Sequence, residues 1–368
     1  MNDTATVQTI LQRYGDEFLS QYPLNHDQMK AFNDILICRT EACGLHTDVC
    51  DNCGDVQTYY NSCGNRHCPQ CQAVEREIWI HKEKYNTLDN IQYFHVVFTI
   101  PHELNILYLF DPVNCYNILF KASASALKKA AKNKKYLGAD VGFTSVLHSW
   151  GSNMSLHPHI HMIVSGGGLS NGKWIESKKK FFVPVKALSK MFRAIYLKML
   201  RKAEITLPND WSHDRFYKLT QECYEKNWVV YTKEPFKDSY HVIKYLGRYT
   251  HRIAISNQRI VSCDDGKVTF TYKDYKDNEK IKEITIDAIE FIRRFMLHVL
   301  PKGFMKIRHY GYLGNKNKKE RLELCKELTQ TPIIPYEKPN MIDILKLILK
   351  KDVSLCPACK MRRHHNLQ

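Results

Sequence analysis

The sequence predicts an α+β protein in which an antiparallel sheet is sandwiched by helices, with a helical, cysteine-rich N-terminal module and a basic C-terminal extension. Two observations lead to this prediction. Segments with helical periodicity alternate with short β-branched and aromatic runs along most of the 368 residues. Seven of the thirteen cysteines fall between Cys38 and Cys71, a density that favours a small metal-stabilised module. A hydrophobic fraction of 44% and an aromatic fraction of 11% exclude a disordered chain.

Helical and extended segments can be placed along the chain from their periodicity. Apolar side chains at helical spacing predict helices at residues 1–37, 72–90, 103–135 with an interruption near Pro112, 185–204, 213–226, 239–252 and 287–299. Runs such as YFHVVFTI predict strands at residues 93–100, 141–150, 156–164, 229–232, 253–262, 267–273 and 281–286. The polar turn GSNMS joins the second and third strands, and a Gly-rich loop, Ser165–Gly168, is expected after the third.

The charge distribution indicates an anionic partner, most simply nucleic acid. The chain carries 54 Lys and Arg against 38 Asp and Glu, and residues 301–368 alone hold 15 basic against 6 acidic residues. We expect three domains: helices with a metal-binding module at 1–75, a central domain at 76–300 and a basic extension at 301–368. No apolar run approaches the roughly 18 residues of a membrane span, and the start MNDTATVQTI lacks a secretion signal. We therefore expect a cytoplasmic protein without membrane contact.

The cysteine cluster has the spacing of a zinc site. Its pattern is His46-x3-Cys50-x2-Cys53-x9-Cys63-x4-Cys68-x2-Cys71, with His67 beside Cys68. Each Cys-x2-Cys pair can place two thiolates on one tetrahedral ion, and a reducing compartment favours metal ligands over disulfides. We predict one zinc ion bound by Cys50, Cys53, Cys68 and Cys71. The remaining candidates either build a second site or replace one ligand: His46, Cys63 and His67. The pair Cys356-Pro-Ala-Cys359 is half a site or a chance pair.

A histidine-rich strand is the second candidate site. In His157-Pro158-His159-Ile160-His161, the side chains of His159 and His161 point to the same face, because successive residues of a strand alternate. Two imidazoles one pleat apart can chelate one divalent ion. The third ligand stays open between His148, on the neighbouring strand, and His157, which Pro158 can bend away.

A tyrosine pair supplies candidate nucleophiles. Tyr245 and Tyr249 lie four residues apart on a predicted helix, about 6 Å from each other on one face. Buried aromatic faces seldom carry many cations, so the basic residues that flank this pair favour a phosphate site over core packing. These residues are Lys244, Arg248, His251 and Arg252.

Four segments of the chain resemble one transposase family. YNSCGNRHCPQCQ, HPHIHMIVSGGGLS, YLGRYTHRIAISN and HVLPKGFMKIRHYGYLGN are similar to the rolling-circle transposases of the insertion-sequence-ninety-one type. These are two-tyrosine members of the HUH endonuclease superfamily, where HUH stands for His-hydrophobic-His. The resemblance extends from the cysteine cluster to about residue 315. Two features depart from it: Gly64 stands where a basic residue is common, and Cys38 and Cys43 have no place in the pattern.

The resemblance implies a structural Zn²⁺ in an N-terminal zinc-binding domain and an HUH-type antiparallel sheet in the catalytic domain. It also implies that His159 and His161 hold a catalytic Mg²⁺ or Mn²⁺, and that Tyr245 and Tyr249 attack DNA. The implied activity is nicking of single-stranded DNA at the element ends through a 5′-phosphotyrosine intermediate, followed by strand transfer to target DNA. The residues expected to contact DNA are Arg66, Lys244, Arg248, Arg252, Lys302 and Arg308.

The implied setting is the bacterial cytoplasm, in association with the nucleoid and with host replication proteins as partners. Three alternatives stay open. A rolling-circle replication initiator or a relaxase would share the same chemistry. A non-catalytic zinc-finger DNA-binding protein would leave the histidine strand and the tyrosine pair as coincidences. A metallohydrolase would need a carboxylate as general base, and none is adjacent to the histidine strand.

Overall fold

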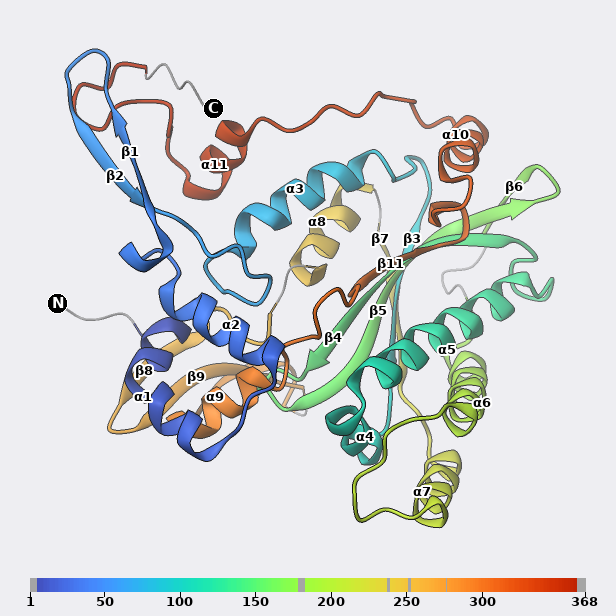
Figure 1. Ribbon diagram of the computed structural model, residues 1–368. Helices are drawn as coiled ribbons and strands as arrows, with labels where there is room; N and C mark the ends of the chain where they lie inside the picture. The colour runs from blue at the N-terminus through green and yellow to red at the C-terminus, as the bar shows by residue number, and fades with distance from the viewer. Residues whose placement is uncertain (1–4, 178–182, 237–238, 251–252, 276, 363–368) are drawn as a thin grey trace.

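The computed structural model describes residues 5–177, 183–236, 239–250, 253–275 and 277–362, without the side chains of residues 234, 235, 239, 240, 246, 248 and 249. Its centre is a six-stranded antiparallel sheet with the order β11-β4-β5-β3-β7, and β6 pairs with the end of β5 (Figure 1). The strands are β3 (Tyr93–Thr99), β4 (Asp140–Trp150), β5 (Leu156–Ser170), β6 (Lys173–Glu176), β7 (Val230–Phe236) and β11 (Ile307–Tyr310). The fold class predicted from the sequence, α+β with an antiparallel sheet between helices, is confirmed.

Helices cover both faces of this sheet. Ile160, Met162 and Val164 of β5 share a buried core with one set of helices: α4 (Asn105–Phe110), α5 (Pro112–Lys132), α6 (Val185–Lys202) and α7 (His213–Glu225). Ile163 points to the opposite face and packs with the other set: α3 (Gln72–Lys84), α8 (Ser239–Thr250) and α10 (Lys318–Leu328). Because side chains alternate along β5, His159 and His161 lie on the α3–α8 face.

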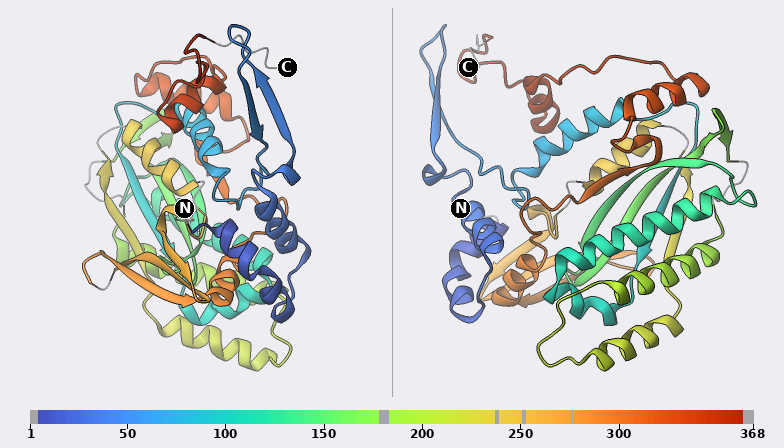
Figure 2. Two further views of the ribbon diagram at one scale, coloured as in Figure 1. Left: turned by 90° about the vertical axis from the view of Figure 1, so that its left-hand side faces the viewer. Right: turned by 45° about the vertical axis from the view of Figure 1, so that its right-hand side comes forward.

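A second body packs the N-terminal helices against a small sheet from the middle of the chain (Figure 2). Phe18 and Phe32 share a core with Phe270 and Phe291, and the side chain of Gln28 donates to the Met296 carbonyl at 3.0 Å. The elements are α1 (Val7–Gln21), α2 (His26–Ile37), β8 (Ile260–Asp264), β9 (Lys267–Asp274), β10 (Lys280–Asp287) and α9 (Ala288–Met296). Residues 253–299, predicted as part of the central domain, thus complete the core of the N-terminal helices.

The C-terminal segment returns to a hairpin formed by residues 45–60. β1 (Leu45–Val49) and β2 (Val56–Tyr60) form a two-stranded arm that extends away from both cores. After α10, the chain runs across the top of α3, forms α11 (Met341–Leu349) and reaches the tip of this arm (Figures 1 and 2). Among the described residues, no helix is long and apolar enough to cross a membrane.

Two sequence predictions about local structure were incomplete. The expected Gly-rich loop at Ser165–Gly168 is a continuation of β5, which extends to Ser170. A Cβ on Gly166 or Gly168 would lie within 2.7 Å of a neighbouring backbone carbonyl, so these glycines permit close pairing of strands. The basic C-terminal segment also contributes β11, which pairs with β4 at the edge of the central sheet. The three predicted domain boundaries stay a prediction.

Candidate catalytic and metal sites

Three histidines converge on one point of the α3–α8 face. His148 on β4 pairs directly with His159 on β5, and His161 follows one pleat later. The Nε2 atoms of His159 and His161 are 3.1 Å apart, and one ring nitrogen from each of the three histidines lies within 4.8 Å of the others. The ring of His157 lies beside that of His159, tilted by 47° with centroids 5.2 Å apart, but is outside this group. The strand pairing thus brings His148 next to the two histidines of the predicted chelate.

The hydrogen bonds of these imidazoles suit a metal ion. The Nδ1–H of His159 donates to the His157 carbonyl at 2.7 Å, because a carbonyl can only accept, and this leaves the Nε2 lone pair for a ligand. Burial disfavours the charged form of an imidazole and lowers the pKa of His157, which lies beside His159. Neutral imidazoles are common ligands of divalent metal ions, so three converging histidines could hold such an ion.

A fourth histidine, His95, connects this group to Tyr245. His95 lies buried in the middle of β3, and its Nε2 is 2.9 Å from Nδ1 of His161. Its Nδ1 is 3.3 Å from the hydroxyl of Tyr245, whose ring stands nearly perpendicular to the imidazole. Burial, with a further contribution from Lys233, lowers the pKa of His95 to about 4, so the ring is neutral at physiological pH.

Sequence reasoning missed His95. A single histidine in an apolar strand is usually a satisfied core residue, and only the pairing of β3 with β5 reveals its neighbour. The available signal was the polar residue in the run YFHVVFTI, which is otherwise apolar apart from its Thr.

The position of Tyr245 depends on close packing between α3 and α8. Gly247 on α8 faces Ile80 on α3, and a Cβ built on this glycine would lie 2.3 Å from the Ile80 Cδ1 atom. A glycine at this position of the YLGRY segment therefore lets the two helices approach. Tyr249 lies one turn after Tyr245 on α8, and Lys244 is exposed on the same helix. Arg252 and the side chains of Arg248 and Tyr249 lie outside the described residues.

The cysteines form two clusters instead of the one predicted. In each, the four sulfur atoms lie within 4.8 Å of one another, a geometry that suits a tetrahedral zinc ion. The base cluster comprises Cys38, Cys63, Cys68 and Cys71, and the tip cluster comprises Cys50, Cys53, Cys356 and Cys359. The four residues predicted to share one ion are thus divided between the two, because Cys50 and Cys53 lie at the tip of the β1–β2 hairpin while Cys68 and Cys71 lie at its base.

The base cluster is seated on the second body. Cys38 and Cys68 are buried beside Phe32 and Ile35, and Cys71 is the N-cap residue of α3. The Sγ atoms of Cys38 and Cys63 lie 3.6 and 3.7 Å from that of Cys71. The cluster therefore includes Cys38, which the sequence pattern could not place. It also includes Cys63, which the sequence left open as a zinc ligand.

The two histidines of the cysteine-rich segment belong to neither cluster. His46 is hydrogen-bonded through Nδ1 to the side chain of Asn61 at 3.1 Å. His67 accepts from the backbone N–H of Leu300 at 3.3 Å, and burial lowers its pKa to about 3. His67 therefore supports the loop that follows α9.

The residues predicted to contact DNA differ in their surroundings. The guanidinium of Arg66 donates to the carbonyls of Leu300, Pro301 and Phe304 at 2.7 to 3.1 Å, which turns it inward. Arg308 lies over the ring of Phe120, 4.1 Å from its centroid, and is half-buried. Lys302 is exposed. Arg66 thus fixes the segment after α9, whereas Lys302 and Lys244 are accessible to a phosphate.

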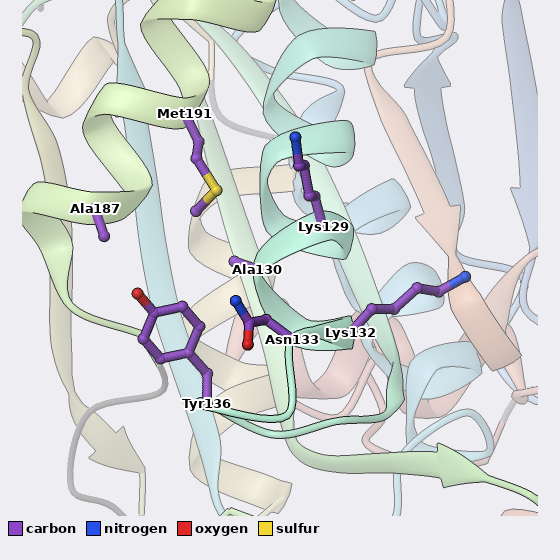
Figure 3. A pocket seen from close by; sticks show the side chains of 7 residues that line it. All are labelled: Lys129, Ala130, Lys132, Asn133, Tyr136, Ala187 and Met191. Carbon is purple, nitrogen blue, oxygen red and sulfur yellow. The ribbon is translucent and has the colours of Figure 1, made fainter.

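A shallow pocket lies at the opposite side of the sheet, between the end of α5 and the start of α6 (Figure 3). Lys129, Lys132 and Tyr136 contribute to its rim, and Met191 reaches toward it from α6. It belongs to the face that α5 and α6 cover, so it is separate from the histidine group.

Comparisons with known proteins identify the family of this chain. The family model described as "Transposase zinc-binding domain" matches residues 10–100, and the model described as "Putative transposase" matches residues 142–321. The chain is 38% identical over 370 residues to "Putative transposase y4qJ" of Sinorhizobium fredii, covering 96% of this chain and 92% of that protein.

A second relative is the transposase for insertion sequence element IS801 of Pseudomonas savastanoi pv. phaseolicola. It is 26% identical to the chain over 356 residues, covering 94% of this chain and 84% of the relative. No solved structure is similar to the chain at a significant level. The cysteine clusters fall largely within the first matched segment, and the histidine strand and α8 fall within the second. The chain therefore belongs to the IS91-type transposases and carries their N-terminal zinc-binding domain.

Proposed function

We propose that this transposase nicks single-stranded DNA at the ends of its insertion sequence by tyrosine transesterification and transfers the strand to a target. The observation that carries the proposal is the connection from His161 through His95 to the hydroxyl of Tyr245, with distances of 2.9 and 3.3 Å. A zinc-finger regulator would have no use for a phenol held against a histidine group. The family membership favours a transposase over a replication initiator or relaxase with the same chemistry.

His148, His159 and His161 are the residues that would hold a divalent ion, Mg²⁺ or Mn²⁺. Such an ion supplies polarisation of the scissile phosphate and offsets the charge that develops there. In this arrangement the Nε2 atoms of His159 and His161 face each other, while both Nδ1 atoms are engaged by the protein. The chain thus orients the two rings before any ligand arrives.

In the proposed mechanism, the order of hydrogen bonds would activate Tyr245. With Nε2 of His161 kept for a divalent ion, the proton of that ring would lie on Nδ1 and would be donated to Nε2 of His95. The single proton of the neutral His95 ring would then lie on Nδ1 and would be donated to the Tyr245 oxygen. A hydrogen bond to the phenol oxygen favours the phenolate, which is the nucleophilic form. His95 is therefore a positioning residue for the nucleophile.

The reaction exchanges one phosphodiester for another. The Tyr245 hydroxyl loses its proton to solvent and its oxygen forms a bond to the scissile phosphorus. The bond from phosphorus to the 3′ oxygen breaks, and that oxygen takes a proton from solvent to become a 3′-hydroxyl. The energy of the phosphodiester is retained in the 5′-phosphotyrosine, so no ATP is required. Tyr249 allows a second cleavage before the first link is resolved, which suits transfer of a strand from donor to target.

The remaining segments serve DNA binding in this proposal. Residues 1–75 would bind the element end, residues 76–300 would hold the catalytic groups, and residues 301–368 would add phosphate contacts through exposed cations such as Lys302. Lys244 and Arg248 beside Tyr245 would contact the phosphates next to the scissile bond. Host replication proteins would replace the strand that is moved.

Covalent capture tests the proposal. Wild-type protein incubated with labelled single-stranded DNA of the element end and Mn²⁺ should give a protein–DNA adduct on a denaturing gel. The adduct should require Mn²⁺, should be lost in EDTA and in His159→Ala, and should be absent when Tyr245 and Tyr249 are both changed to Phe. Tyr217→Phe is the matched control, because this exposed tyrosine lies on α7 at the other face of the sheet. An adduct formed by the double Phe variant would refute the assignment.

A further inference from the structure

We propose that the tip cluster, Cys50, Cys53, Cys356 and Cys359, binds a structural zinc ion of its own, which fastens the C-terminal segment to the tip of the β1–β2 hairpin. This site lies partly outside the segment that matches the zinc-binding domain, since two of its four ligands come from the last residues described. The proposal concerns how the fold is closed and does not depend on the nicking reaction.

The sulfur positions fit a four-thiolate zinc site. The Sγ atoms of Cys50 and Cys359 are 3.7 Å apart, and those of Cys53 and Cys356 are 3.8 Å apart. A tetrahedral ion with Zn–S bonds of about 2.3 Å places its sulfurs about 3.8 Å from one another. A disulfide would instead bring two sulfurs to about 2.05 Å. The spacing is therefore that of ligands around a common ion.

The first half of the site is a knuckle at the hairpin tip. The backbone N–H of Cys50 donates to the carbonyl of Asp55 at 2.9 Å, and the N–H of Gly54 donates to the carbonyl of Cys50 at 2.8 Å. Gly54 adopts a φ of +72°, which glycine accepts readily. The pair Val49–Val56 closes the turn as the last rung of the β1–β2 ladder.

The second half repeats this conformation about 300 residues later. The N–H of Cys356 donates to the carbonyl of Met361 at 2.9 Å, and the N–H of Lys360 donates to the carbonyl of Cys356 at 3.0 Å. Lys360 has a φ of +59°, and a β-bridge between Leu355 and Arg362 closes the turn. Each hydrogen bond, the positive φ and the closing pair occur at the same offsets from the first cysteine in both halves. Two matched knuckles facing each other are the two halves of a zinc ribbon.

The C-terminal segment has little else to hold its end in place. In α11 only Ile344 is buried, while Leu347 and Leu349 are exposed. The contacts of the preceding stretch include Tyr336, which packs on Tyr85 with centroids 5.1 Å apart, and the Glu337 carbonyl, which accepts from the ring of His81 at 2.8 Å. A segment without its own core needs a cross-link, and a zinc site supplies folding free energy directly.

The segment crosses the helix that supports the nucleophile. α11 packs on α3, and Leu347 shares a pocket with Ile80 of α3 and Ile243 of α8. An ion at the tip cluster therefore holds α11 over the α3–α8 pair. Its loss should release residues 331–362 without unfolding either core.

Zinc stoichiometry and local protection test the proposal on the full chain. Cys356→Ser should bind one zinc ion fewer than wild type, and hydrogen exchange should show lost protection at 331–362 with α1 and α2 unchanged. Cys50→Ser should give the same result, although this residue lies about 300 positions away. Cys359→His keeps a ligand and should retain the ion. Cys43→Ser is the control, because Cys43 lies outside both clusters.

Unmodified protein provides a second measurement that does not depend on folding of the variants. Alkylation of the zinc-loaded chain should spare all four cysteines of the tip cluster, and a chelator should expose Cys356 and Cys359 to the reagent. Unchanged zinc content in Cys356→Ser would overturn the proposal. So would continued protection of 331–362 in Cys50→Ser, or equal alkylation of Cys356 with and without zinc.

Discussion

Replacing Gly247 by alanine tests whether the packing of α8 on α3 sets the position of Tyr245, the proposed nucleophile. The added Cβ would lie 2.3 Å from Cδ1 and 2.5 Å from Cγ1 of Ile80. Non-bonded carbons prefer about 3.5 to 4.0 Å, so α8 must move or Ile80 must turn by roughly 1.2 to 1.7 Å. Tyr245 lies two residues before Gly247 on the same helix, so a shift of α8 changes its distance to His95.

The expected effect on activity is larger than the effect on stability. Overpacking of this kind destabilises by about 1 to 3 kcal/mol, and alanine in place of a helical glycine returns about 1 kcal/mol. The free energy of unfolding should therefore fall by no more than about 2 kcal/mol. Misplacing a reacting group by about 1 Å can lower the rate on the order of 100-fold. Adduct formation by Gly247→Ala should thus slow about 100-fold in a chain that remains folded.

Single-turnover adduct formation and urea denaturation measure the two effects. Ile80→Ala removes both atoms that the new methyl group would meet, so the double variant Ile80→Ala/Gly247→Ala should recover most of the lost rate. Ile80→Ala alone serves as the control and should react within a few-fold of wild type. A wild-type rate for Gly247→Ala, or a double variant no faster than Gly247→Ala, would show that this packing does not set the position of Tyr245.

Three further predictions follow from the structure. His95→Ala should lower adduct formation about 100-fold while fluorescence anisotropy shows unchanged DNA affinity; weakened binding instead would point to a structural role. Burial raises the pKa of Glu83 to about 7, so folding takes up a proton between pH 4.5 and 7 and stability falls as pH rises through this range. Urea denaturation should show Glu83→Gln gaining up to about 3 kcal/mol relative to wild type between pH 5 and 8; a gap independent of pH would contradict this. Cys68→Ser should contain one zinc ion fewer and bind the element end more weakly, yet still cleave short single-stranded oligonucleotides at high concentration; full zinc content would refute it.

The central sheet was predictable because its signals are local. The apolar run at Tyr93–Ile100 and the alternation through His159 and His161 each report on one strand, and a short polar turn favours antiparallel pairing of its neighbours. The pairing then placed His148 opposite His159, as the turn length suggested. Local patterns thus located the histidine group but not its connection to Tyr245, which depends on three separate elements.

The grouping of the cysteines was not predictable from spacing. Two Cys-x2-Cys pairs with 14 residues between them are compatible with one ion. Nothing in the local sequence shows that one pair lies at the tip of a hairpin and the other at its base. Cys356 and Cys359 supply only two of four ligands, and the sequence does not show the other two because Cys50 and Cys53 lie about 300 residues earlier. Similarly, the packing of α1 and α2 on residues 253–299 depends on apolar faces that are equally compatible with other partners.

Both cysteine clusters are connected to α3, one through its first turn and the other through α11. Cys71 of the base cluster is the N-cap residue of α3, so an ion bound there fixes where α3 begins. The tip cluster would hold the segment whose α11 packs on α3, with Leu347 in one pocket with Ile80. Ile80 also meets Gly247 of α8, about half a turn from Tyr245. Packed helices transmit displacements to one another. A shift of α3 caused by loss of either ion would therefore move α8 and Tyr245, although Tyr245 belongs to neither cluster. Under the proposed mechanism, zinc bound at the two clusters would therefore support the position of Tyr245 through α3.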